Sequence, residues 1–197
     1  MLEVEVKGVV PDWNEAVRRV EAAGGALTFA GRLEDRRYDT ADRALRSQDV
    51  VLRLRVYRTG AESRAELDWK GPTSHEGGYK RREELGAHIV DAGAFDEILH
   101  RLGYEVTVAI DREIRQYTLL GATVRFERYP RMDDLVEVEG APDAIERAIA
   151  ALGLERGAFT SERLPQFVRR FEARTGQVAA LADAELAGTT HFDPANA

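Results

Sequence analysis

Apolar and polar side chains alternate along much of this chain with a period of two residues. The opening ten residues, MLEVEVKGVV, show this pattern, and residues 50–57, VVLRLRVY, repeat it strictly. Such alternation is typical of β-strands, in which successive side chains point to opposite faces. The pattern predicts about eight strands, at residues 1–10, 26–38, 50–57, 65–70, 79–90, 104–119, 122–127 and 134–139.

Helical patterns interrupt the strands. One helix is expected at residues 11–25, where Pro-Asp opens the segment and two glycines close it. Asp91 caps a second helix that ends at Gly103, and two more are predicted at residues 142–152 and 161–174. Strands that follow one another through short turns, with helices between some of them, favour a closed antiparallel sheet. We therefore predict an α+β fold, an eight-stranded antiparallel β-barrel with helices packed outside.

Length and composition narrow the class of protein. The 197 residues fit one domain, which we place at residues 1–176, followed by a polar, Ala-rich tail at 177–197 that we expect to be flexible. The chain has no cysteine, no signal-peptide pattern and no apolar run of about 20 residues, so we expect a cytoplasmic protein without membrane spans. The net charge of -7 disfavours nucleic acid as a partner, although it can conceal a local basic pocket.

Charged residues gather on one face of six predicted strands. Residues two apart share a face, and the charged sets are Glu3, Glu5 and Lys7; Arg53 and Arg55; Glu66, Asp68 and Lys70; Arg82 and Glu84; Arg125 and Glu127; and Glu137 and Glu139. One interpretation is that each strand has a solvated face. The alternative is that the charged faces line the inside of the barrel.

Two features favour the interior interpretation. The opposite, apolar face carries Trp69 and Phe126, which would pack well under amphipathic helices. Like charges on one strand also repel each other unless opposite charges lie between them. Carboxylates favour a hard cation such as Mg²⁺ or Mn²⁺, while Arg and Lys favour phosphate oxygens. A charged interior of this kind therefore predicts a complex of a metal with a polyphosphate as the ligand.

Several short motifs occur in a characteristic order. They are Glu3-Val4-Glu5-Val6-Lys7, Tyr38-Asp39-Thr40, Leu52-Arg53-Leu54-Arg55, Trp69-Lys70-Gly71-Pro72, Arg82-Glu83-Glu84 and Leu135-Val136-Glu137-Val138-Glu139. The first reproduces an ExExK signature, and the whole series, over residues 2–155, resembles the CYTH, or triphosphate tunnel metalloenzyme, superfamily. That superfamily includes class IV adenylyl cyclases, thiamine triphosphatases and inorganic triphosphatases.

The resemblance implies roles for individual residues. Glu3, Glu5, Glu137 and Glu139 would hold one or two metal ions, Mg²⁺ or Mn²⁺, with Glu84 and Glu127 nearby. The triphosphate would be bound by Lys7, Arg53, Arg55, Lys70, Arg82, Arg112 and Arg115, and by Arg125, which shares a face with Glu127. The four principal glutamates and Lys7 would form the catalytic set.

The chain departs from the family pattern at a few positions. Gly86 stands where the family often has a second Glu, and Glu127 stands where it usually has Asp. The family's Lys-x-Arg element matches only loosely, as Arg112 and Arg115. The four histidines are scattered without metal-ligand spacing.

Three functions remain open at this stage. The whole-chain pattern places a class IV-like adenylyl cyclase first, converting ATP to cyclic AMP and pyrophosphate. An inorganic triphosphatase or thiamine triphosphatase would use the same tunnel with water as the nucleophile, and a non-catalytic binder of polyphosphate or nucleotide is the third. The expected partner is thus a small triphosphate, namely ATP, tripolyphosphate or thiamine triphosphate, and a homodimer is left open.

Overall fold

The computed structural model describes residues 2–192, with side chains from residue 4 onward. Eight antiparallel strands form a closed barrel, which confirms the predicted fold class. The order around the barrel is β1-β9-β8-β7-β2-β3-β4-β6, and β6 pairs with β1 to close it. The bounds are β1 Leu2–Val9, β2 Ala26–Thr40, β3 Val51–Thr59, β4 Glu62–Lys70, β6 Tyr79–Ile89, β7 Tyr104–Leu119, β8 Ala122–Arg128 and β9 Leu135–Glu139.

Two short strands and six helices complete the part of the chain that the structure describes. Strand β5 (Ser74–Glu76) pairs with β6, and β10 (Phe159–Thr160) pairs with β1. The helices are α1 Trp13–Ala22, α2 Ala44–Ser47, α3 Ala92–Arg101, α4 Pro142–Leu152, α5 Leu164–Thr175 and α6 Asp183–Leu186. None of these helices is long and apolar enough to cross a membrane.

Helix α2 was not predicted, because its sequence reads as a polar turn. The Asp39 carboxylate stabilises it by accepting hydrogen bonds from the backbone nitrogens of Leu45 (3.0 Å) and Arg46 (2.9 Å). These bonds satisfy backbone donors that a short helix leaves unpaired. Asp39 and Leu45 are six residues apart, and the pattern of hydrophobic residues does not indicate a contact between them.

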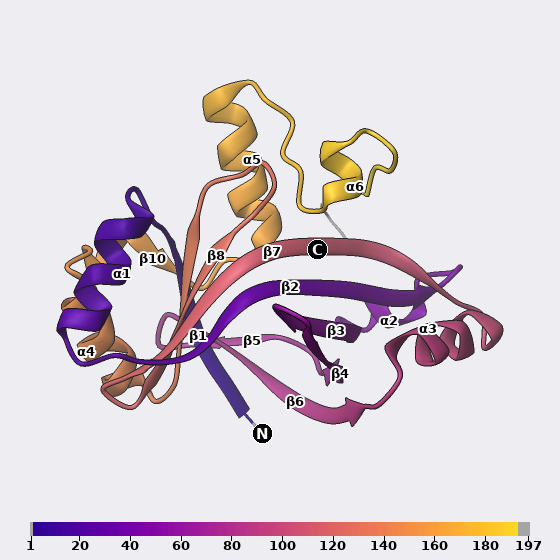
Figure 1. The fold of residues 1–197 in the computed structure, drawn as a ribbon, viewed down its shortest axis with the longest axis horizontal. Coiled ribbons are helices and arrows are strands. Elements are labelled where there is room, and N and C mark those ends of the chain that lie inside the picture. The colour runs from indigo at the N-terminus through magenta and orange to yellow at the C-terminus, as the bar shows by residue number, and fades with distance from the viewer. Residues whose placement is uncertain (1, 193–197) are drawn as a thin grey trace.

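The largest apolar cluster lies outside the barrel, beneath α1 and α4, which sit together at the left of Figure 1. The strands contribute the residues that alternate with charged ones, among them Val6, Val124, Phe126, Val136 and Val138. The helices contribute residues such as Trp13, Val17, Val20, Ile145 and Ile149. Because the apolar faces of these strands are covered from outside, their charged faces point into the barrel. The interior interpretation of the charge pattern is therefore confirmed for this side of the barrel.

Apolar residues also occur on the inner face, above and below the charged stretch. On β7, Arg112 lies between Ile110 and Ile114 in the same alternation. Ile110 belongs to a cluster that the first turns of α5 complete through Leu164 and Phe167. Ile114 belongs to a second cluster, with Phe29, Leu33 and Tyr57. The charged interior is thus bounded by apolar side chains on two sides.

The segment after α5 packs against the barrel instead of forming the flexible tail that we expected. Ala180 pairs with Arg131, and the Leu181 carbonyl accepts a hydrogen bond from the Asp111 backbone nitrogen at 2.7 Å. Strand β8 pairs with β7 only from Glu113 onward, so the edge of β7 at Asp111 is available for this contact. Unpaired backbone groups at such an edge favour the added chain. The remainder of the predicted tail, residues 193–197, lies outside the described residues.

Candidate active site

A cavity lies inside the barrel and is lined almost entirely by charged side chains. Among the described side chains, ten basic and four acidic residues surround it, together with Val51 and Leu164. Ten lining residues were predicted from the sequence, namely Glu5, Lys7, Arg53, Arg55, Lys70, Arg82, Arg112, Arg125, Glu127 and Glu137. They come from seven different strands, so only the closed barrel brings them together.

One part of the site is organised around Asp35, which is completely buried. Arg55 donates to both of its carboxylate oxygens, at 2.7 and 3.0 Å, and Arg112 donates to Oδ2 at 2.6 Å. Arg53 contacts the same oxygen at 3.4 Å. Burial alone would raise the pKa of Asp35, but the charges of Arg55 and Arg53 hold it well below its usual value. Asp35 therefore stays ionised and holds the guanidinium groups of Arg55 and Arg112, whereas the closer partner of Arg53 is Asp68, at 2.6 Å.

A second part joins β1, β8 and β9. Lys7 Nζ lies 2.9 Å from Glu137 and 3.3 Å from Glu127, and Arg125 donates to Glu137 at 2.9 Å. Glu127 is also 2.9 Å from Arg112 Nη1. Burial favours the neutral forms of these groups, but the pKa of Lys7 is raised by the charge of Glu127 and that of Glu137 is lowered well below its usual value by Lys7. All of these side chains are consequently charged at neutral pH.

Tyr129 supports this second part from the adjoining apolar cluster. Its hydroxyl donates to Glu127 Oε2 at 2.7 Å. Burial, followed by the negative charge of Glu127, raises the pKa of the phenol. Tyr129 is thus a fixed hydrogen-bond donor that orients Glu127, and sequence reasoning had not singled it out.

Positive charge exceeds negative charge in the cavity. Arg82 donates to backbone carbonyls, those of Gly71 at 2.7 Å and Asp49 at 2.8 Å. Burial, and next the positive charge of Arg53, lower the pKa of Arg37 to about 9. At this pKa the guanidinium of Arg37 is still charged at neutral pH, but the positive charges of its neighbours disfavour the charged form. The arrangement would be stabilised by an anion in the cavity.

Four charged lining residues were missed, namely Arg37, Lys80, Glu162 and Arg163. Arg37 shares a face with Asp35, and Lys80 shares one with Arg82, so the rule of residues two apart could have identified both. Glu162 and Arg163 precede α5 and reach the cavity through a long-range contact, in which Arg163 donates to Asp49 at 2.8 Å. Periodicity gives no signal for such a contact.

Arg115 lies apart from the other residues that were predicted to bind phosphate. It is exposed and pairs with Ala30 and Phe126 across the sheet, outside the cavity lining. Arg112 and Arg115 are three apart, and an odd spacing places two side chains on opposite faces of a strand. The match to the family's Lys-x-Arg element had led us to group Arg115 with Arg112, against this rule.

The expected metal ligands are only partly assembled. Glu5 and Glu139 face each other across β1 and β9, with Glu137 two residues from Glu139. Glu84 forms an ion pair with Lys70, and neither Glu84 nor Glu139 reaches the cavity lining. Glu3 lies on β1 in register with Arg82, but its side chain is outside the described residues. Among side chains that are described, no three carboxylates or histidines converge as a metal centre.

The donor chemistry nevertheless fits a hard divalent cation. Carboxylate oxygens on neighbouring strands are the ligands that Mg²⁺ and Mn²⁺ prefer. Here Lys80 forms an ion pair with Glu5, and Lys7 and Arg125 hold Glu137. A metal ion at these glutamates would have to replace the basic groups, which would then be available to an anion.

Comparison with known proteins identifies the family. The family model for the CYTH domain matches residues 1–151. An adenylate cyclase candidate from Vibrio parahaemolyticus has a similar structure, with a TM-score of 0.72 at 18% identity over 86% of this chain and 98% of that one. The PH1819 protein from Pyrococcus horikoshii OT3 has a TM-score of 0.69 at 22% identity over 89% and 99%.

A third similar structure is that of an adenylyl cyclase candidate from Hippeastrum, described as having a dominant triphosphatase activity. Its TM-score is 0.62 at 17% identity, over 91% of this chain and 98% of that one. No match was found among curated proteins. At these identities the three structures show the fold alone, whereas the family model covers most of the chain. The chain belongs to the CYTH domain family.

Proposed function

We propose that this protein is a divalent-metal-dependent enzyme that hydrolyses the terminal phosphate of inorganic triphosphate. The observation that carries the proposal is the cavity lining, in which the described residues include ten basic and four acidic side chains and no aromatic one. Such a lining suits a chain of phosphates and offers no surface on which an adenine ring could stack. The sequence had placed the cyclase first, and the lining favours the hydrolase.

The arginines supply the main contacts to the phosphates. A guanidinium presents paired N–H groups that match phosphate oxygens, and a rigid guanidinium loses little entropy on binding. Asp35 holds Arg55 and Arg112, Asp68 holds Arg53, and backbone carbonyls hold Arg82. These four groups are therefore oriented before the substrate arrives.

The carboxylates provide the place for Mg²⁺ or Mn²⁺. Glu5, Glu137 and Glu139 would hold the metal, with Glu3 from the same face of β1 and with Glu127 and Glu84 nearby. When bound, a divalent cation supplies charge neutralisation at the phosphoryl oxygens and polarises the phosphorus for attack. Whether one or two ions bind is part of the proposal's test.

Hydrolysis forms a bond from a water oxygen to the terminal phosphorus and breaks the bond from that phosphorus to the bridging oxygen. Pyrophosphate leaves with the electron pair, and the proton of the water passes to phosphate oxygen or solvent. In a loose transition state the leaving group gathers negative charge, so positioned cations lower the barrier more than a strong base would. Lys7 and Arg55 meet this requirement because their acidic partners keep them charged and fixed.

An adenylyl cyclase is the second candidate. Two of the similar structures are named as adenylyl cyclase candidates. The same contacts to β and γ phosphates would serve that reaction, with the ribose 3′-hydroxyl in place of water. The cyclase would require an adenine site outside the described lining of the cavity.

Phosphorus NMR of the reaction products tests the proposal. The protein is incubated with Mg²⁺ or Mn²⁺ and with tripolyphosphate, ATP or thiamine triphosphate in separate samples. We expect orthophosphate and pyrophosphate from tripolyphosphate, and a loss of at least about a hundredfold in rate for Glu5→Gln and Arg53→Gln. Arg101→Gln, at the exposed end of α3, is the matched charge control.

The other outcomes each point to a different function. Cyclic AMP and pyrophosphate from ATP, without turnover of tripolyphosphate, would establish the cyclase. Thiamine triphosphate as the one productive substrate would make the protein a thiamine triphosphatase. Binding without turnover of any of the three would leave the non-catalytic binder.

A further inference from the structure

One edge of strand β6 has no partner strand over its second half. On one side, β6 pairs with β5 and then with β4, and the register with β4 runs without a shift over residues 84–89. On the other side, β1 pairs only with residues 80–83, and this pairing ends where Leu2 meets Glu83. Within the part of the chain that the structure describes, no strand pairs with residues 85–89 on that side. These residues therefore form an open edge of the sheet, which we call the β6 edge.

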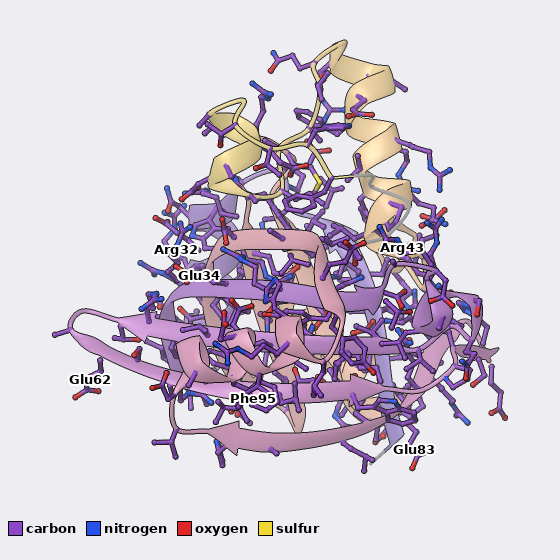
Figure 2. All side chains as sticks on the ribbon, turned by 90° about the vertical axis from the view of Figure 1, so that its right-hand side faces the viewer. Arg32, Glu34, Arg43, Glu62, Glu83 and Phe95 are labelled. Atoms are coloured by element: carbon purple, nitrogen blue, oxygen red, sulfur yellow. The ribbon has the colours of Figure 1, made fainter. Side chains whose placement is uncertain are left out.

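The β6 edge lies at the boundary of the molecule. In Figure 1, β6 runs along the lower side of the barrel toward α3, and Figure 2 shows Glu83, where the pairing with β1 ends, at the lower right. Helix α3 packs over the outer face of the sheet, where Leu99 and Phe95 join Ala65 in an apolar cluster. Leu85, which is 59% exposed, and the three residues after it are all exposed. The helix thus leaves the β6 edge accessible to solvent.

The β6 edge lacks the features by which folded proteins usually prevent further pairing at an open edge. Those features are proline or lysine on the strand, a β-bulge, and a covering helix or loop. Residues 85–89, Leu-Gly-Ala-His-Ile, contain neither proline nor lysine, and their pairing with β4 shows no bulge. The backbone donors and acceptors on this side are therefore available to an added strand.

The side chains of the β6 edge complement a second copy of themselves. In an antiparallel pair with Gly86 opposite Gly86 of the second copy, Leu85 stands opposite Ala87, and Glu84 stands opposite His88. A two-fold axis makes each of these contacts twice, as in other isologous interfaces. Apolar groups then meet apolar groups, and no like charges face each other over residues 84–88.

The same arrangement extends an apolar patch on the outer face of the sheet. Leu85 lies opposite Trp69 of β4, and Ala87 lies opposite Leu67. Trp69 and Leu67 are half-buried, whereas Leu85 and Ala87 are exposed. A second copy at the β6 edge would join two such patches and remove part of their apolar surface from water. A partner strand with a charged outer face would not gain this contact.

We infer that two copies of this chain form a symmetric dimer through their β6 edges, which pair in antiparallel fashion about Gly86. The sheets of the two barrels then continue into each other. Because the paired edge is short, the dimer should form in a concentration-dependent way. The inference concerns assembly and does not depend on the proposed function.

Sedimentation velocity of the full chain tests the inference, over protein concentrations from about 1 µM to about 500 µM. We expect the mass to rise with concentration from 22.0 kDa toward twice that value. Ala87→Lys places a charge against the apolar Leu85 of the second copy and should raise the dissociation constant of the dimer at least about tenfold. Ala150→Lys, at an exposed position of α4, is the matched control and should dimerise as the wild type does. Thermal melting verifies that both variants are folded.

Single cysteine variants test the register, since the chain contains no cysteine. Opposite residues of antiparallel strands have Cα atoms about 4.5–5.5 Å apart, which a disulfide can bridge. An added Cβ at Gly86 would lie 3.4 Å from Asp68 Oδ1, an ordinary contact, so the fold can accept the substitution. With diamide as the oxidant, Gly86→Cys should form a disulfide-linked dimer at least about tenfold faster than Ala150→Cys, whose thiols meet only by collision.

Three results would each overturn the inference. A monomer at every concentration would do so, and the β6 edge would then be left to a strand of a different partner. A dimer that Ala87→Lys leaves unchanged would show that the two copies meet elsewhere. Oxidation of Gly86→Cys no faster than that of Ala150→Cys would show that the strands do not pair about Gly86. None of these measurements uses a triphosphate, so a failure of the proposed function would not affect them.

Discussion

Asp35 shows at the scale of one residue how a buried charge can serve a binding site. A carboxylate with no exposure to water is costly unless opposite charges compensate it. Arg53, Arg55 and Arg112 supply that compensation, and all three also line the cavity. The acid therefore fixes the arginines without removing the positive excess of the site.

The stability of the fold should depend on pH through such groups. Burial opposes ionisation of Asp35 and Glu137, but Arg55 and Lys7 respectively lower their pKa values well below the ordinary 3.8 and 4.5. A group with a depressed folded-state pKa stabilises the protein above its ordinary pKa, and this contribution is lost as the pH falls toward the folded-state value. We expect the free energy of unfolding to fall steeply below about pH 4.5, as measured by urea denaturation.

The substitution Asp35→Asn separates the contribution of Asp35 to the stability of the fold from the contributions of other groups. The variant should lose roughly 3–5 kcal/mol at neutral pH, because three buried guanidinium groups lose their shared carboxylate. Its acid-induced fall should also be shallower than that of the wild type. Glu97→Gln, at an exposed pair on α3, is the control. An unchanged stability and an unchanged acid slope would show that the Asp35 cluster contributes nothing to folding.

At the scale of elements, the neighbouring strands β1, β6 and β9 carry the groups that we propose for metal and anion. Lys80 of β6 forms an ion pair with Glu5 of β1, which in turn faces Glu139 of β9. In the proposed function, a metal ion at Glu5 would compete with Lys80 for this carboxylate. Lys80 would then be able to contact phosphate, so we expect metal and triphosphate to favour each other's binding.

Lys80→Met tests this competition. We expect the variant to bind Mn²⁺ more tightly than the wild type in the absence of triphosphate, by several-fold, and to bind tripolyphosphate more weakly. Electron paramagnetic resonance of free Mn²⁺ measures the first effect, and calorimetry the second. Arg81→Met is the matched control, because Arg81 points to the other face of β6 and pairs with Glu76. Weaker Mn²⁺ binding by Lys80→Met would show that the lysine does not compete with the metal.

At the scale of the whole molecule, the barrel depends on chain segments far from it in sequence. In Figure 1, α5 and α6 lie above the barrel while α1 and α4 cover its side. The segment between α5 and α6 adds Leu181 to the apolar cluster formed by Ile110, Leu135 and Phe167. The C-terminal region is thus part of the folded domain, although the family match ends at residue 151.

Leu181→Ala tests that role. Removing a buried leucine side chain typically costs about 2–5 kcal/mol, and the variant should unfold at a correspondingly lower urea concentration. Leu186→Ala removes the same atoms from a half-exposed position in α6 and should cost far less. Similar stabilities for the two variants would mean that the segment rests on the barrel without stabilising it.

The alternation of charged and apolar residues by itself determined the strands and the sorting of side chains between their faces. It placed Lys7, Arg53, Arg55 and Glu137 correctly on the inner face, because residues two apart on a strand share a face whatever the fold. The same rule would have excluded Arg115 and included Arg37. Local periodicity thus shows which side chains of one strand point to the same face.

Contacts between distant segments were decided only by the tertiary structure. The pairing of β1 with β6 closes the barrel, Asp35 meets Arg112 across 77 positions, and Arg163 reaches Asp49 across 114. Such contacts depend on the register of strands and on the path of the chain after α5, and no local period reports either. The sequence alone therefore specified which side chains of a strand share a face, and the closed barrel decided which face is inside and which side chains meet.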